Sequence, residues 1–126
     1  MIHGIGTDIV EVSRIESLWE RHGQRFAERI LSADELAELD GHTAPARLLA
    51  KRFAAKEAFA KAVGSGMRGP VGFRSMAVTH DGLGKPVLTF DEELRTHLAQ
   101  LGISGHHLSI SDERGMVVAF VVLESL

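Results

Sequence analysis

Two acidic residues far apart in the chain, Asp8 and Glu57, are of the type that holds a hard cation. Asp8 belongs to an extended, glycine-rich segment, 4–11. Because strand side chains alternate between faces, Gly4, Gly6 and Asp8 share one face. We expect the two glycines to leave room there for a ligand beside the carboxylate. Mg²⁺ prefers carboxylate and phosphate oxygens, although a turn cap would also account for Asp8.

Glu57 lies in a predicted helix, 45–63, which Pro45 can open and Gly64 can end. At about 100° per residue, Glu57 falls between an apolar stripe and a stripe of small residues. A carboxylate in that position is partly buried and needs a partner. Lys61, one turn further on, can be that partner. The alternative is an ordinary surface pair, worth about 0.2–0.5 kcal/mol.

Basic residues concentrate in the same helix. The segment 47–61 contains only one acid, Glu57. It contains five basic residues, which are Arg47, Lys51, Arg52, Lys56 and Lys61. A locally basic surface of this kind suits an anionic small molecule or an acidic partner. The loop 64–66 follows the helix, where the dipole repels anions, so a phosphate bound there needs a cation or a metal ion beside it.

A polar row is predicted near the C-terminus. His107, Ser109 and Ser111 alternate with Leu108 and Ile110, so the polar side chains share one strand face. The row can donate hydrogen bonds to a ligand, but a half-exposed antiparallel strand has the same pattern.

Composition limits the class of protein. The chain has 126 residues, enough for a single domain spanning 1–126, with 44% apolar and 25% charged residues. A net charge of −3 argues against a general nucleic-acid binder. There is no cysteine, no apolar run of about 20 residues and no signal-peptide pattern. We therefore expect a cytoplasmic protein that does not bind a membrane.

The first half of the chain reads as a strand followed by helices. Residues 1–10 are strand-like. Ser13 and Glu16 form a capping-box pattern for the next helix, which Gly23 can interrupt. Ser32 and Glu35 repeat that pattern before a short helix that stops near residue 41.

The second half reads mainly as strands. Strands are predicted at 76–80 and 86–90 around a Gly-rich turn, followed by a helix at 91–101 and a second hairpin at 106–111 and 116–123. The last strand is apolar on both faces, which places it at the centre of a sheet or in an interface. The order of elements predicts an α+β domain with helices on one side of a mostly antiparallel sheet.

Together these segments resemble the holo-acyl-carrier-protein synthase family, the short type of phosphopantetheinyl transferase. The motifs that carry the resemblance extend over nearly the whole chain, and they are 4–11 with Arg14-Ile15, 52–62 with 64–66, Gly84-Lys85-Pro86, and 107–111. The resemblance implies the 4′-phosphopantetheinyl transferase fold, with a long central helix packed on the sheet. It also implies a homotrimer with a coenzyme A site between neighbouring subunits.

The family's chemistry implies roles for three residues. Asp8 and Glu57 would hold Mg²⁺, and Lys61 would contact the pyrophosphate of coenzyme A, so all three are catalytic candidates. A serine of the acyl carrier protein would attack the β-phosphorus and release 3′,5′-ADP, in support of fatty acid biosynthesis. Phosphoryl transfer of this type needs positioning and charge neutralisation more than covalent chemistry. Glu57 could also accept the serine proton.

The resemblance further implies a set of coenzyme A contacts. They are Arg52, Lys56, Lys61, Gly64, Ser65, Gly66, Lys85, Pro86, His107, Ser109 and Ser111. Several family members have histidine where this chain has Asp112, and that histidine is associated with the 3′-phosphate. Since an acid cannot replace it, we expect basic residues elsewhere, Arg52 foremost, to hold the 3′-phosphate.

The first helix is the expected docking surface for the acidic carrier protein. Four arginines fall within about 80° of one another if the helix continues through residue 23, and they are Arg14, Arg21, Arg25 and Arg29. Leu18 and Phe26 could supply the apolar part of the contact. A solvated basic face is the alternative.

Two other functions remain open at this stage. One is a non-catalytic trimeric protein that binds coenzyme A or the carrier. The other is a different Mg²⁺-dependent nucleotide enzyme, such as a pyrophosphatase.

Overall fold

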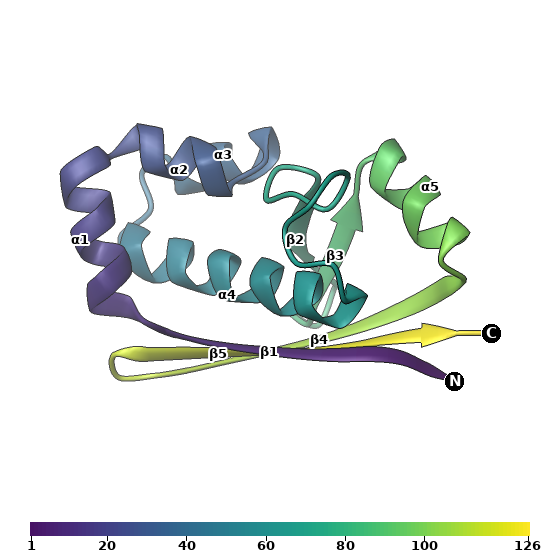
Figure 1. Cartoon of the computed structure of the whole chain (residues 1–126). Coiled ribbons are helices and arrows are strands. Elements are labelled where there is room, and N and C mark those ends of the chain that lie inside the picture. Colours follow the sequence, from purple (N-terminus) through teal and green to yellow (C-terminus); the bar gives the residue numbers. More distant parts are fainter.

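A computed structural model describes all residues from Met1 to Leu126. The chain forms helices and strands in the order shown in Figure 1. They are β1 (Ile2–Glu11), α1 (Val12–His22), α2 (Gln24–Ile30), α3 (Ala33–Leu39), α4 (Pro45–Val63), β2 (Met76–His80), β3 (Pro86–Phe90), α5 (Glu92–Gln100), β4 (Ile103–Glu113) and β5 (Met116–Ser125).

The strands form two antiparallel sheets. β1, β5 and β4 make a three-stranded sheet in that order, and β2 pairs with β3 in a separate hairpin. All helices lie on one side of the three-stranded sheet, with α4 along it (Figure 1). The α+β class and the antiparallel pairing are thus confirmed. The strands are divided between two sheets because β3 pairs only with β2.

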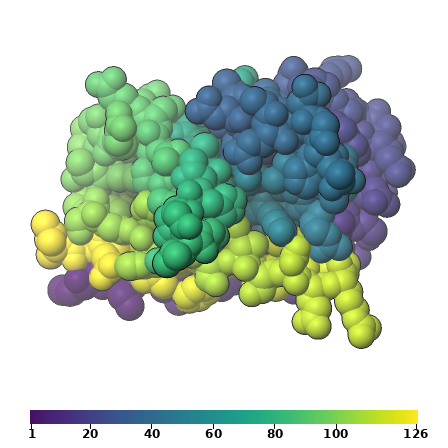
Figure 2. All heavy atoms as spheres, turned by 180° about the vertical axis from the view of Figure 1, so that it is seen from behind, coloured from purple at the N-terminus to yellow at the C-terminus, as the bar shows by residue number.

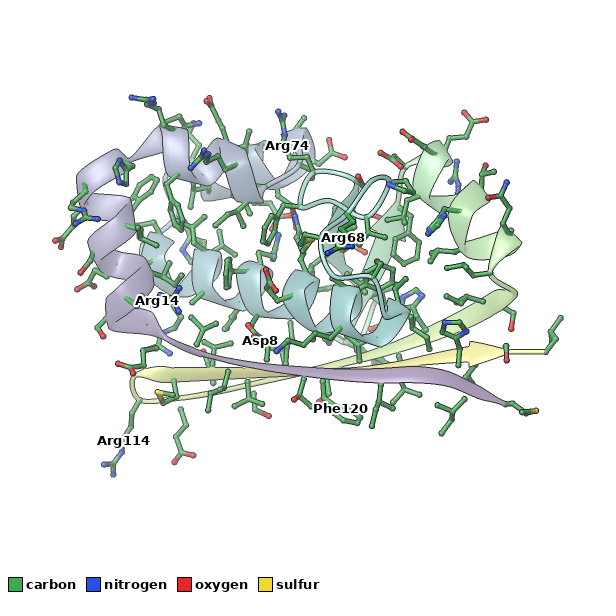
Figure 3. The ribbon with its side chains drawn as sticks, in the orientation of Figure 1. Asp8, Arg14, Arg68, Arg74, Arg114 and Phe120 are labelled. Carbon is green, nitrogen blue, oxygen red and sulfur yellow. The ribbon has the colours of Figure 1, made fainter.

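The last strand, β5, is the middle strand of its sheet, as its apolar character on both faces predicts. Its inward residues pack against α4 and belong to the hydrophobic core, and they are Val117, Ala119, Val121 and Leu123. Phe120 points to the opposite face and is 40% exposed. Figure 3 shows this side chain directed away from α4. One face of the sheet is therefore covered by helices and the other is open.

Local signals explain where most helices begin and end. Ser32 caps α3 with the predicted capping box, in which the Ser32 amide donates to Glu35 Oε1 at 2.9 Å. The second predicted box, at Ser13, is wrong. α1 begins at Val12, so Ser13 lies inside its first turn and Glu11 is the N-cap residue without a side-chain bond.

Helix α4 has the predicted bounds. Pro45 occupies its first turn, and Gly64 closes it in a left-handed conformation with φ 101°. Leu49 and Phe59 are fully buried between α4 and its neighbours. No helix in the structure combines the length and the apolar character needed to cross a membrane.

Candidate active site

Asp8 and Lys61 meet where β1 passes beneath α4. The Lys61 ammonium lies 3.2 Å from Asp8 Oδ1 and donates a 2.9 Å hydrogen bond to the Thr7 carbonyl. The other carboxylate oxygen, Asp8 Oδ2, is buried and has no hydrogen-bond partner. Figure 3 shows Asp8 in the space between the strand and the helix. A buried carboxylate oxygen without a partner is costly, so the site is suited to a bound cation.

Glu57, one turn before Lys61 on α4, belongs to the same cluster. Burial raises the pKa of Glu57, the negative charge of Asp8 raises it further, and Lys61 opposes the increase. The two carboxylates are therefore close enough to repel each other. The sequence predicts Lys61 as the partner of Glu57, but the structure pairs it with Asp8 instead, because β1 brings that carboxylate to the ammonium.

The residues present fit a magnesium ion. Mg²⁺ in proteins keeps several waters and binds through one or two carboxylates together with substrate phosphates. Asp8 supplies an unpartnered oxygen and Glu57 a second acid that is destabilised by its neighbour. No group of three or more His, Asp or Glu side chains is placed so that the side chains alone could hold a metal ion.

The glycines of β1 do not leave room for a ligand. A Cβ on Gly6 would lie 2.0 Å from the Ala58 carbonyl oxygen, and one on Gly4 would lie 2.1 Å from that of Ala62. The sequence interpretation is therefore wrong at these positions. The space beside the two glycines is filled by the backbone of α4.

The structure contradicts the predicted contacts of Arg52 and Lys56 with coenzyme A. Both side chains are buried and ion-paired with Glu35, which is itself buried. Arg52 also binds Glu38, and the Lys56 ammonium donates to the carbonyls of Ile30 and Phe73. A phosphate cannot reach either cation without breaking this network.

The pKa values of the buried pair reflect both burial and attraction. Burial lowers the pKa of Lys56, and the Glu35 carboxylate opposes that change. Burial would raise the pKa of Glu35, but Lys56 and the backbone amides of Val78 and Ser32 together hold it below its usual value. The network is a structural connection between α3, α4 and β2.

Of the remaining predicted coenzyme A contacts, Lys61 lies beside Asp8, and the others belong to the loop after α4, the segment entering β3, and β4. The Gly64 and Gly66 amides both donate to the Ala60 carbonyl, beside Ser65, so they are not free to cradle an anion. Lys85 is exposed and immediately precedes β3, which begins at Pro86.

The polar row of β4 confirms the predicted alternation. Leu108 is buried, whereas His107, Ser109 and Ser111 are exposed on the open face of the sheet. Asp8 points to the opposite face, toward α4. One subunit therefore cannot place this row and Asp8 around the same ligand.

Asp112 is paired with two of the basic residues of α4, a contact that the sequence did not predict. Its Oδ2 lies 3.3 Å from Arg47 Nη1 and 3.2 Å from Lys51 Nζ. A cavity of about 170 Å³ adjoins the pair, and its lining residues are Lys51, His80, Gly84, Pro86, Ile110 and Asp112. On this side of the molecule the β2–β3 hairpin reaches down toward β4 (Figure 2). The signal in the sequence was the four-residue spacing of Arg47 and Lys51, which places them on one helix face.

The predicted basic face on the first helix is divided between two helices. Gly23, with φ 52°, ends α1, so the arginines at 14 and 21 precede the break and those at 25 and 29 follow it. None of the four forms an ion pair within the chain. A groove of about 660 Å³ runs beside the break and is lined by Leu18, His22, Arg25, Phe26, Glu28 and Arg29. It contains both apolar residues expected at a docking surface.

The family of the chain follows from comparison with known proteins. Residues 4–120 match the family model described as the 4′-phosphopantetheinyl transferase superfamily. The chain therefore belongs to that superfamily.

Named relatives cover the chain almost completely. It is 57% identical over 124 residues to the holo-[acyl-carrier-protein] synthase of Nitrosomonas europaea. The alignment covers 98% of this chain and 99% of the relative. The crystal structure of the Neisseria meningitidis synthase superposes with a TM-score of 0.96 at 54% identity, over 99% of this chain and 100% of that one. The Bacillus anthracis synthase, solved in complex with CoA (3′,5′-ADP), superposes with a TM-score of 0.83 at 41% identity. This superposition covers 100% of this chain and 99% of that one.

Proposed function

We propose that this chain transfers 4′-phosphopantetheine from coenzyme A to a serine of apo-acyl carrier protein, releasing 3′,5′-ADP for a role in fatty acid biosynthesis. The observation that carries the proposal is the meeting of Asp8, Glu57 and Lys61 between β1 and α4. It occurs in a chain 57% identical over nearly its full length to a holo-[acyl-carrier-protein] synthase. A related synthase was solved with coenzyme A.

The proposed mechanism uses the three residues in different ways. Asp8 and Glu57 would hold Mg²⁺. When bound, this ion would neutralise negative charge on the diphosphate oxygens. The serine oxygen forms a bond to the β-phosphorus, and the bond from that phosphorus to the 3′,5′-ADP oxygen breaks. Lys61 stabilises the charge that develops on the leaving phosphate. Glu57 takes the serine proton, directly or through a water.

We further propose that three copies assemble through the open face of the sheet, with α4 as the central helix of each subunit. The face carries large exposed apolar side chains, including Ile5, Ile9 and Phe120. Apolar groups in such a continuous patch are typical of an interaction surface. His107 and Ser109 lie on the same face. A neighbouring subunit could therefore bring this polar row to the Asp8 site and complete the coenzyme A pocket.

Arg47 and Lys51 are the cations that we propose for the 3′-phosphate. Arg52 is buried with Glu35, so it cannot serve in that role. Lys51, in contrast, borders the cavity that contains Gly84 and Pro86, two residues of a motif shared with the family. Two cations share the single charge of Asp112, which leaves net positive charge for an anion.

The acidic carrier protein is proposed to dock on α1 and α2. Arg14, Arg21 and Arg25 supply positive charge without an acidic partner in the chain, and Leu18 and Phe26 add apolar surface in the adjacent groove. We also propose that residues 1–126 act as one domain in the cytoplasm, in line with a chain free of cysteine.

A mass-shift assay tests the transfer. The protein is incubated with apo-carrier, coenzyme A and Mg²⁺, and the carrier should gain the mass of one phosphopantetheine, with none gained when a chelator is present. Asp8→Asn and Glu57→Gln should each abolish the gain while the protein stays folded. Glu113→Gln, at the exposed tip of the β4–β5 hairpin, is the matched control and should remain active.

The same assay separates the alternatives. A wild-type protein that binds coenzyme A and adds no mass would support the non-catalytic binding protein, which the synthase relatives do not favour. Hydrolysis of a pyrophosphate bond without carrier would support a different nucleotide enzyme. Full transfer by either acid variant would refute the assignment of the metal.

A further inference from the structure

The backbones of β1 and α4 are in direct contact at two glycines. If residue 6 had a Cβ, that atom would lie 2.0 Å from the Ala58 carbonyl oxygen and 2.8 Å from the Ala62 backbone nitrogen. Gly4 meets the Ala62 oxygen in the same way at 2.1 Å. The atoms on the helix side are all backbone, so no side-chain rotation could make room for a larger residue.

The contact sets the register between the strand and the helix. Two strand residues advance about 6.6–6.8 Å, and one helical turn advances 5.4 Å. Gly4 lies at Ala62 and Gly6 at Ala58, so β1 runs opposite to α4 and the next inward residue, Asp8, falls one turn nearer the start of the helix. That turn lies beside Glu57, which is consistent with the effect of Asp8 on the Glu57 pKa.

The gap between the two elements widens along the strand. At positions 4 and 6 the helix leaves space for no side chain larger than the hydrogen of glycine. At position 8 there is space for the carboxylate of Asp8, which contacts Lys61. Figure 1 shows α4 approaching the sheet toward its C-terminal end, the end that lies over the two glycines. The two elements form a wedge with the glycines at its narrow end and the acids where it opens.

We propose that Gly4 and Gly6 are positioning residues that fix the separation of Asp8 from Glu57 and Lys61. The inference rests on the proposed function, because it concerns the acids that would hold the metal ion. A Cβ at residue 6 requires a displacement of about 1 Å to reach the shortest contact that real Cβ atoms make. Mg²⁺ requires near-ideal octahedral geometry with short bonds, so a shift of that size separates the acids from a shared ion.

The test is Gly6→Ala, with Gly105→Ala as its matched control. Gly105 lies in β4 of the same sheet, and a Cβ there would meet only a Glu124 side-chain oxygen at 3.7 Å. Mn²⁺ alone is titrated against each protein by electron paramagnetic resonance, and kcat and KM are measured separately. Gly6→Ala should bind Mn²⁺ at least about tenfold more weakly and lose about 100-fold in kcat, as expected for a 1 Å misplacement. The Gly105→Ala variant should match the wild type in both.

A merely structural role would lower the melting temperature of Gly6→Ala and leave Mn²⁺ affinity per folded molecule unchanged, which would overturn the proposal. If Gly6→Ala does not fold, Gly4→Ala decides. Residue 4 adjoins a register irregularity at the start of β1, where the strand can adjust. The Gly4→Ala variant should bind Mn²⁺ at least about threefold more weakly, a smaller change because it lies further from the acids. Wild-type affinity in that variant would overturn the proposal.

The outcomes distinguish this inference from the proposed function. A wild-type protein that binds Mn²⁺ and transfers no phosphopantetheine would overturn the function alone. A transferring wild type whose folded glycine variants keep their Mn²⁺ affinity and kcat would overturn the positioning role alone.

Discussion

The Lys61 ammonium bridges the two elements that carry the acids, donating to Asp8 Oδ1 at 3.2 Å and to the Thr7 carbonyl at 2.9 Å. Its side chain is 53% exposed, and an ion pair with one exposed partner is worth little because water screens it. Lys61 can therefore leave Asp8 for a phosphate oxygen at small cost. In the proposed mechanism, the same residue would pair with the carboxylate before substrate binds and with the diphosphate afterwards.

The raised pKa of Glu57 predicts a pH dependence of stability. Burial and the charge of Asp8 lift this pKa above its ordinary value of 4.5. Between 4.5 and the raised value, the folded state holds a proton that the unfolded state has lost. The free energy of unfolding contributed by Glu57 should therefore fall as the pH rises through that window. Melting temperatures of the metal-free wild type and Glu57→Gln, measured across pH, should converge toward low pH. Parallel curves for the two proteins would contradict the cause given for the shift.

The pairing of Lys51 with Asp112 predicts how the 3′-phosphate is recognised. Lys51→Ala should raise the KM for coenzyme A by about tenfold, the loss expected for one charge-assisted contact. It should barely change the KM for dephospho-coenzyme A, which lacks that phosphate. Asp112→Asn should lower the KM for coenzyme A, because it removes an acid that competes for both cations. Arg95→Ala, at an exposed arginine of α5, is the control. Equal effects on the two substrates would place the 3′-phosphate elsewhere.

The unpaired arginines beside the α1–α2 groove predict electrostatic docking of the carrier. Arg21→Glu or Arg25→Glu should raise the carrier KM by tenfold or so and leave the KM for coenzyme A unchanged, since charge reversal acts on the acidic partner. Added salt should reduce the difference between the variants and the wild type. Arg95→Glu applies the same charge change at the other end of the molecule and should have little effect (Figure 1). A change limited to coenzyme A affinity would exclude this surface.

The exposed Phe120 predicts that assembly depends on the open face of the sheet. Phe120→Glu places a charge in the proposed interface, and burying it there would be costly. Analytical ultracentrifugation should show trimers for the wild type and smaller species for the variant, with transfer reduced in parallel. Leu83→Glu replaces an equally apolar, fully exposed residue on the β2–β3 turn and should remain trimeric. An unchanged mass for Phe120→Glu would rule out this face as the interface.

Local patterns in the sequence were sufficient for most of the fold. Pro45 and Gly64 set the limits of α4, and the apolar character of β5 on both faces identified the middle strand. These features depend on neighbouring residues alone. Ser13 misled because a serine within the first helical turn has the same local pattern as an N-cap residue, and only the path of β1 into α1 decides between them.

The environment of the site residues could not be read from local patterns. The types of Asp8, Glu57 and Lys61 were recognisable, but the contact of Lys61 with Asp8 joins residues 53 positions apart. Arg47 and Arg52 cannot be told apart by residue type, but Arg52 is buried because it pairs with Glu35 in another helix. The expectation that the glycines of β1 leave room for a ligand was wrong, because the backbone of α4 fills that space and its position could not be read from the local pattern.

The burial of Lys56 predicts a loss of stability without a loss of coenzyme A affinity. Lys56→Met removes the cation that joins Glu35 to the carbonyls of Ile30 and Phe73. Removing one partner of a buried ion pair should reduce the free energy of unfolding by about 3–5 kcal/mol. Urea denaturation measures that loss. The KM for coenzyme A, measured where the variant is folded, should equal that of the wild type. A stable Lys56→Met variant with a raised KM would restore Lys56 as a phosphate ligand.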